Sequence, residues 1–146
     1  MPTARLLPDV PAPAAVLGLA GVVPFAAGAL GSFWPGALGA FATAALLAYG
    51  AVILSFLGGI HWGLAIGQGG PSYRRLGVGV APSLVGWVAL LLGGAGGLLL
   101  LAAVFVAVFG LDVQLTRRGM APAWFPRLRI VLTAAVVLCL LVAALS

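Results

Sequence analysis

The chain has 146 residues, of which 64% are hydrophobic and 6% are charged, and its mean hydropathy is +1.27. A soluble domain carries charge on about a quarter of its residues, so this composition indicates a protein embedded in lipid. Five membrane-spanning helices of roughly 20 residues each would leave only short connections, which excludes a separate soluble catalytic or binding domain. The formal charge of +5 comes from arginines beside hydrophobic segments, so it does not indicate nucleic acid binding.

The first apolar segment, residues 14–31, contains Pro24, which predicts a kink in a membrane helix. Small residues near its end would suit a signal-peptide cleavage site. However, the side chains of the lead sum to zero charge, and Pro11 and Pro13 directly precede the apolar run. We therefore expect this segment to be retained as a helix.

Four further apolar segments follow, separated by short connectors rich in glycine, proline or arginine. They cover residues 40–67, 77–92, 98–115 and 130–145. The connector at 93–97 (GGAGG) is expected to be a tight turn, and residues 116–129 a basic loop. The sequence thus predicts an all-α integral membrane protein, with residues 1–146 forming a single domain of five transmembrane helices in one bundle.

The arginines all fall on one side of a five-span arrangement. Short loops rich in arginine stay in the cytoplasm, so we expect a cytoplasmic amino terminus and a periplasmic carboxyl terminus in a bacterial inner membrane. The residues expected to anchor the protein at the membrane interface are Arg74, Arg75, Arg117, Arg118, Trp124 and Arg127. Arginines at this depth also attract anionic lipid headgroups, although setting the topology already accounts for them.

The segment 40–67 carries a glycine stripe, defined here as Gly59, Gly63 and Gly67, at a spacing of four residues. Such spacing lets another helix approach closely, and Ser55 extends the same face. We expect this face to pack against a neighbouring span, with Gly79 and Gly86 as the opposing groove. The alternative is a seam between two copies of the chain.

His61, the single histidine, lies about 200° around the helix from Gly59 and shares a face with Gln68. Ionisable residues in membrane helices mark functional sites, and Asp112 is the candidate partner of His61. The favoured interpretation is structural: Asp112 forms one salt bridge that holds the last loop, and His61 bonds a carbonyl. The alternative is a polar ligand site made of His61, Gln68, Asp112 and Arg129, able to hold an anionic headgroup, a quinone head or a proton.

Recognisable reaction chemistry is absent from the sequence. One histidine and one nearby carboxylate fall short of a metal site, and no pair of haem ligands is well placed. No set of nucleophile, base and orienting group is present, so we expect no catalytic residue, no metal and no cofactor.

The string ILSFLGGIHWG at Ile53–Gly63, preceded by Tyr49, resembles the signature of the transmembrane-protein-69-like family of small inner-membrane proteins of unknown function. The other matching positions are Pro82, Trp87, Asp112, Pro122, Trp124, Leu128, Arg129 and Thr133. Phe125 and Pro126 depart from the expected tyrosine and non-proline. The resemblance implies a multi-span inner-membrane protein with mitochondrial relatives, and it carries over no catalytic residue.

Two function hypotheses follow from these features. The first is a non-enzymatic protein that packs with, or assists assembly of, a membrane complex, through a partner protein or a second copy of the chain. The alternative is a protein that handles a lipid, a quinone or another small molecule at a polar site near the cytoplasmic interface. An odd number of spans and interfacial charges argue against a transporter built from inverted repeats. An enzyme ranks third.

Overall fold

The fold is known from a computed structural model, which describes residues 7, 9–68 and 70–146. The described residues form helices and no strands. The helices are α1 (Ala12–Ala20), α2 (Val23–Gly31), α3 (Ala37–Gly67), α4 (Tyr73–Leu92), α5 (Gly94–Arg117) and α6 (Phe125–Ala143). Because α1 and α2 together form one apolar segment, the described residues contain five segments long and apolar enough to cross a membrane. The predicted number of spans is confirmed.

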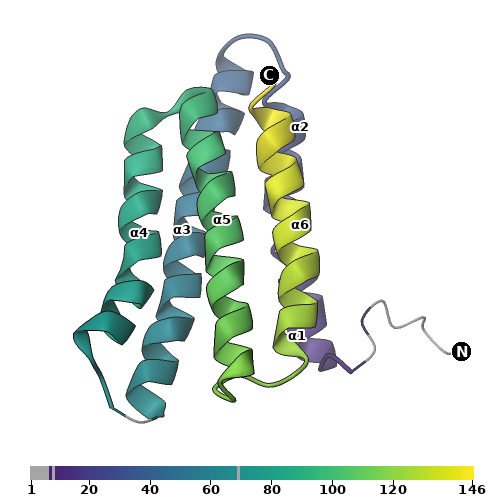
Figure 1. The fold of residues 1–146 in the computed structure, drawn as a ribbon. Coiled ribbons are helices and arrows are strands. Elements are labelled where there is room, and N and C mark those ends of the chain that lie inside the picture. The colour runs from purple at the N-terminus through teal and green to yellow at the C-terminus, as the bar shows by residue number, and fades with distance from the viewer. Residues whose placement is uncertain (1–6, 8, 69) are drawn as a thin grey trace, which may run out of the picture.

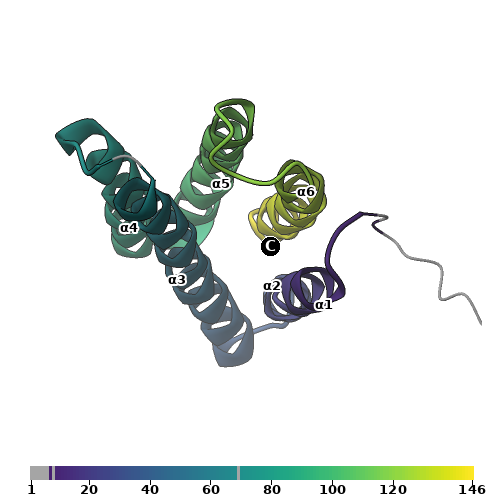
Figure 2. The same cartoon turned by 90° about the horizontal axis from the view of Figure 1, so that it is seen from below.

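The long helices run side by side, and the chain ends at the opposite end of the bundle from the start of α1 (Figure 1). Viewed along the bundle, α3 lies between α4 on one side and α1–α2 on the other (Figure 2). Helices α5 and α6 close the ring, because α5 packs on α4 and α6, and α6 packs on α2. The core between them contains Phe25, Phe105 and several leucines, including Leu54 and Leu101.

The first span is not one continuous helix. It breaks at Gly21 and Val22, just before Pro24, which has no N–H to continue the hydrogen-bond ladder. The hydroxyl of Tyr49 on α3 donates to the carbonyl oxygen of Gly21 at 3.0 Å, so a partner from another helix satisfies a backbone group at the break. The kink expected from Pro24 is therefore present, and α3 supports it.

Helices α3 and α4 share the most extensive contact in the bundle, and glycines make it close. A β-carbon on Gly58 would collide with the carbonyl oxygen of Gly79, and one on Gly86 would lie 3.2 Å from the backbone of Ala51. Lipid supplies no hydrophobic drive between helices, so such close backbone contact provides van der Waals attraction instead. Gly79 and Gly86 thus pack against α3, as expected.

The prediction that Gly79 and Gly86 pack against the glycine stripe is wrong. The glycine stripe faces away from the described helices, since a β-carbon on Gly59, Gly63 or Gly67 would meet nothing within 4 Å. Ser55 is exposed as well, and its hydroxyl donates to Ala51 within α3 at 3.0 Å. Gly58 precedes Gly59 and lies about 100° away around the helix, and this neighbouring face is the one that packs.

Several helix ends differ from the expected boundaries. Helix α4 begins at Tyr73, where the Ser72 hydroxyl accepts from the backbone N–H of Arg75 at 3.3 Å as an N-cap. Helix α5 begins at Gly94, so the expected turn of five residues is reduced to a sharp reversal at Gly93, with φ of 63°. The expected basic loop is shortened too, since α5 continues to Arg117 and α6 starts at Phe125 with Pro126 in its first turn.

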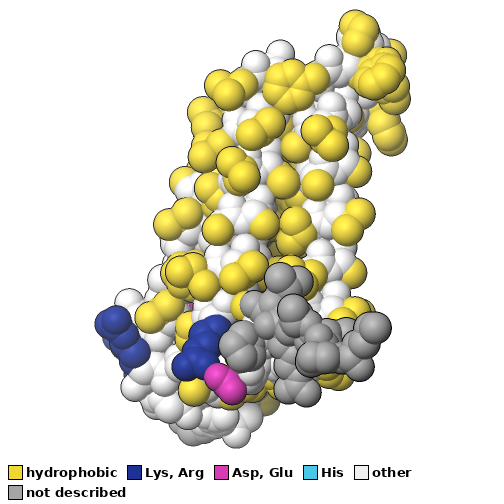
Figure 3. Space-filling model, turned by 90° about the vertical axis from the view of Figure 1, so that its right-hand side faces the viewer, with side chains coloured by type: hydrophobic (Ala, Val, Ile, Leu, Met, Phe, Trp, Pro, Cys, Tyr) yellow, Lys and Arg dark blue, Asp and Glu magenta, His cyan; other side chains and the backbone are white. Residues whose placement is uncertain are grey.

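The arginines of the described residues gather at one end of the bundle. Figure 3 shows one side of the molecule, where hydrophobic side chains cover most of the height and charged side chains appear only at the lower end. Large apolar side chains such as Phe41, Phe56 and Leu138 are exposed on the flanks, as contact with lipid requires.

Candidate polar site within the helix bundle

Three helices each contribute one ionisable side chain to a buried cluster. Asp112 on α5 lies at its centre. His61 Nε2 on α3 lies 2.9 Å from Asp112 Oδ1, and Arg129 Nε on α6 donates to Asp112 Oδ2 at 2.6 Å. Because an ionised carboxylate only accepts, His61 Nε2 is the donor of its hydrogen bond. We call these residues the polar triad.

The polar triad is almost completely enclosed by protein. His61 is 6% exposed, Asp112 1% and Arg129 5%. An unpaired charge in this environment is very costly, whereas a carboxylate held by a guanidinium and an imidazole has both oxygens satisfied. The triad therefore joins α3, α5 and α6 at one point, and it does so with Asp112 and Arg129 neutralising each other.

This arrangement corrects the favoured structural interpretation of the sequence. Asp112 lies about one and a half turns before the end of α5 at Arg117, and its partner is in α6 rather than in a loop. Arg129 was assigned to the basic loop, but α6 already includes it. His61 bonds Asp112 and not a backbone carbonyl.

Two polar atoms beside the polar triad have no partner among the described residues. They are Nη2 of Arg129 and Oγ1 of Thr133, one turn further along α6. Both residues are buried, at 5% and 6% exposure. A buried donor without an acceptor is uncommon in proteins and points to an additional group. The proposed ligand site did not include Thr133, although this residue is one of the positions that carry the family resemblance.

Gln68, by contrast, does not join the polar triad. It is exposed at the end of α3, and its Nε2 donates to the carbonyl oxygen of Met120 at 3.5 Å. The backbone carbonyl oxygen of Gln68 accepts a hydrogen bond from Arg75 Nη1 at 3.2 Å. Gln68 thus connects the two loops at the arginine end of the bundle.

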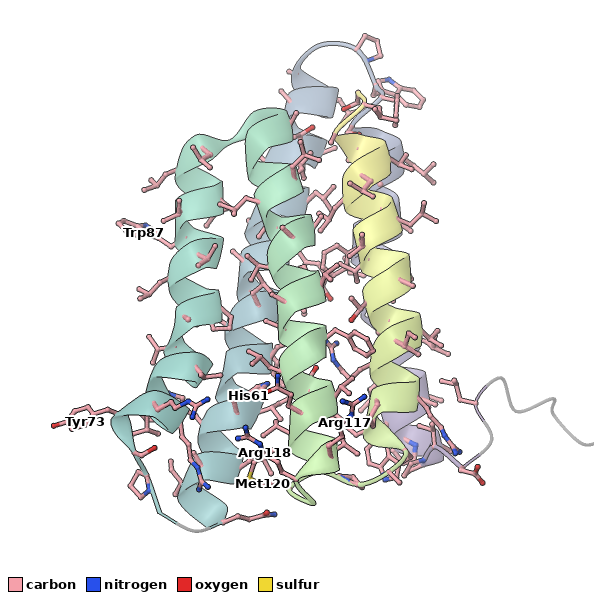
Figure 4. The ribbon with its side chains drawn as sticks, viewed as in Figure 1. His61, Tyr73, Trp87, Arg117, Arg118 and Met120 are labelled. Carbon is pink, nitrogen blue, oxygen red and sulfur yellow. The ribbon has the colours of Figure 1, made fainter. Side chains whose placement is uncertain are left out.

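A cavity of about 300 Å³ opens at this end, and we call it the basic cavity. His61 forms part of its wall, so the cavity borders the polar triad. Its other polar lining residues are Ser72, Arg74, Arg75, Gln114 and Arg118. Figure 4 shows His61 at the same end of the bundle as Arg118 and Met120, while Trp87 points outward far from them.

A second cavity, of about 340 Å³, lies on the other side of the polar triad, and we call it the apolar cavity. Side chains from α1, α2, α3, α5 and α6 line it, and most of them are hydrophobic. Arg129 and Thr133 form part of its wall. The triad is therefore bordered by a basic cavity through His61 and by an apolar cavity through Arg129.

The residues expected to be interfacial anchors differ in their exposure and contacts. Arg74, Arg75, Arg117 and Arg118 are all exposed. Arg127 is exposed as well, and its Nη1 donates to Asp9 Oδ2 at 2.7 Å. Trp124 is partly buried, and it lines the apolar cavity in edge-to-face contact with Phe125.

Residues 10–145 match the family described as "Protein of unknown function (DUF3429)". The chain is also similar to Transmembrane protein 69 of Xenopus tropicalis, with 35% identity over 148 residues, covering 93% of this chain and 55% of the relative. For Transmembrane protein 69 of Mus musculus, the identity is 31% over 138 residues, covering 90% of this chain and 55% of the relative.

The chain thus spans about half the length of the curated relatives it matches. No solved structure gives a significant match. These findings confirm the resemblance described from the sequence. The positions on which that resemblance depends lie far apart in the sequence, yet His61, Asp112, Arg129 and Thr133 meet at and beside the polar triad.

Proposed function

This chain belongs to the DUF3429 family of multi-span membrane proteins, and we propose that it binds an anionic lipid headgroup at its arginine end, without catalysing a reaction. The observation that carries the proposal is the charge balance of the basic cavity. The whole sequence contains two acidic side chains, Asp9 and Asp112. Asp9 pairs with Arg127, and Asp112 pairs with Arg129 and His61.

No acidic side chain therefore remains to neutralise the arginines of the basic cavity. Arg74 and Arg75 lie in the first turn of α4 and Arg118 directly follows α5, and all three line the same space. Ser72, Gln114 and His61 add neutral polar groups to its wall. A phosphate-bearing headgroup supplies the missing negative charge, and arginine binds phosphate with charge-assisted hydrogen bonds.

The test is native mass spectrometry of the protein released from nanodiscs that contain phosphatidylcholine and phosphatidylglycerol. The wild type is expected to retain phosphatidylglycerol preferentially. Replacing Arg74 and Arg118 together with glutamine is expected to abolish this preference. The matched control is Arg127→Gln, which removes an arginine paired with Asp9 outside the cavity. Equal retention of both lipids by the wild type would refute the proposal.

The arginine segregation also supports a topology. We place the arginine end in the cytoplasm and the carboxyl terminus in the periplasm of a bacterial inner membrane, because short arginine-rich loops are retained inside. A reporter enzyme that folds only in the periplasm should be active when fused after Ser146. Activity of a cytoplasm-specific reporter at that position would reverse the assignment.

A second candidate function is docking of another membrane helix as part of a larger complex. It is favoured by the glycine stripe, whose members have open space around their α-carbons. A spacing of four residues between small side chains suits close helix contact. Oxidative cross-linking of Gly63→Cys in a Cys139→Ala background would test it. A cross-linked species that disappears when Gly59 is also replaced by leucine is expected, and its mass distinguishes a second copy from another protein.

A further inference from the structure

The apolar cavity has a polar end that nothing in the described residues satisfies. Arg129 Nη2 and Thr133 Oγ1 are both without partners, and both residues line this cavity. Each can donate a hydrogen bond, the guanidinium through Nη2–H and the threonine through its hydroxyl. An occupant with an acceptor oxygen at this end would satisfy two buried donors at once.

The charge at this end favours a neutral acceptor. Arg129 already gives its Nε–H to the carboxylate of Asp112 at 2.6 Å, and that carboxylate balances its charge. The cavity wall offers no further cation, so a full negative charge would be poorly compensated in an otherwise apolar space. A carbonyl oxygen meets the requirement without adding charge.

Aromatic rings share the remaining wall with aliphatic side chains. Five rings line the cavity from four different helices and the segment before α6: Phe25, Phe56, Phe105, Trp124 and Phe125. Aromatic side chains pack well against flat conjugated rings in offset or edge-to-face geometry. A volume of about 340 Å³ lies at the small end of the range of ligand pockets, roughly 300–1,000 Å³. It suits one substituted ring rather than a whole lipid.

The mouth of the cavity faces the lipid side of the bundle. Leu17 on α1 and Phe56 on α3 both line the cavity, and they are 73% and 65% exposed. Helix α2 packs on both α3 and α6, whereas α1 packs on α6. The cavity therefore opens beside α1, which is the half of the first span that precedes the break. An apolar tail attached to the ring can leave past Leu17 and Phe56 into the hydrocarbon.

We propose that the apolar cavity binds the head ring of a membrane quinone, with Arg129 and Thr133 donating to one of its carbonyl oxygens and the prenyl tail in the lipid. This site goes beyond the headgroup function proposed above, because it uses the opposite side of the polar triad and a neutral ligand. Binding alone is proposed, with no electron transfer.

The test uses decylubiquinone and a variant that keeps Trp124 as the one tryptophan, made by replacing Trp34, Trp62 and Trp87 with phenylalanine. Trp124 lines the cavity, so bound quinone should quench its fluorescence in a saturable manner. Thr133→Val, which keeps the side-chain shape, should weaken binding about tenfold, the factor expected for one lost hydrogen bond. It should leave the unfolding midpoint unchanged, because Thr133 Oγ1 bonds no described protein group.

The matched control is Thr43→Val, because Thr43 lies in the same bundle but bonds Gly39 of its own helix at 3.1 Å. It should bind as tightly as the reference protein. An infrared spectrum of carbonyl-labelled quinone gives an independent readout, in which the carbonyl band shifts to lower frequency on binding and returns in Thr133→Val. Quenching that never saturates, or equal affinity of the folded Thr133→Val protein, would overturn the proposal.

Discussion

The backbones of Gly58 on α3 and Gly79 on α4 lie in direct contact, with no room for a β-carbon on either residue. One turn further along α3, the indole ring of Trp62 also lies against Gly79, and its Nε1 donates to the carbonyl oxygen of Leu76 at 2.8 Å. The start of α4 is thus held against α3 by backbone proximity together with one side-chain hydrogen bond.

This contact predicts opposite results for two adjacent glycines. Gly58→Ala should destabilise the bundle by about 1–3 kcal/mol, since the added methyl group must push α3 and α4 apart. Gly59→Ala should change stability by much less, because its β-carbon meets open space. Unfolding in mixed micelles of mild detergent and dodecyl sulfate measures both. A larger effect at Gly59 than at Gly58 would contradict the packing described here.

The polar triad predicts that the stability of the protein depends strongly on the charge balance between Asp112 and Arg129. Asp112→Asn should destabilise the protein by about 3–5 kcal/mol, because Arg129 keeps a buried charge without a counter-ion. Adding Arg129→Gln to Asp112→Asn should recover a large part of that loss, since no unpaired charge remains. The same micelle titration tests both proteins. A double variant that is less stable than Asp112→Asn would show that the two residues do not act as a pair.

Two arginines on α6 offer a direct comparison of buried and exposed ion pairs. Arg127→Ala should change the free energy of unfolding by at most about 1 kcal/mol, since its bond to Asp9 is exposed to solvent. Arg129→Ala, two residues further on, should cost about 3–5 kcal/mol because it leaves Asp112 buried and unpaired. Similar losses for the two variants would be inconsistent with these environments.

The break between α1 and α2 predicts an effect of Tyr49. Tyr49→Phe removes the hydroxyl that donates to Gly21 and leaves a partly buried carbonyl without that partner. The expected loss is about 1–3 kcal/mol. Cysteine accessibility in α1 should rise in parallel, because the first half of the span loses a link to α3. If α1 remains equally protected while stability falls, the hydroxyl acts elsewhere than at the break.

The number of spans and the gathering of the arginines could be predicted because both depend on averaged properties of long segments. Twenty apolar residues can cross a bilayer whatever their neighbours are, and loop charge needs no knowledge of packing. Helix ends were less predictable, as at Gly93 and Gly94, where two consecutive glycines with positive φ reverse the chain. Local conformations of this kind decide where a helix stops.

The site was predictable in three of its members, His61, Asp112 and Arg129, and in Asp112 as the candidate partner of His61, but the expected member Gln68 does not join it. These three were recognisable as ionisable residues in an apolar chain, whereas the bond between Asp112 and Arg129 depends on the rotation of the helices. The glycine face shows the same limit. Gly58 and Gly59 are adjacent, so the sequence offers α4 two glycine-bearing faces. The closer fit to Gly79 and Gly86 decides between them.

The order in which the chain is synthesised gives the pairing of Asp112 and Arg129 a consequence for biogenesis. Helix α5 leaves the ribosome before α6, so Asp112 enters the membrane before its strongest partner exists. A lone carboxylate or guanidinium costs about 2.5–3.5 kcal/mol on insertion at the centre of a span, and less towards its end, where Asp112 and Arg129 lie. Arrival of α6 removes both penalties together. We therefore expect a chain that lacks α6 to be recognised and degraded by membrane quality control.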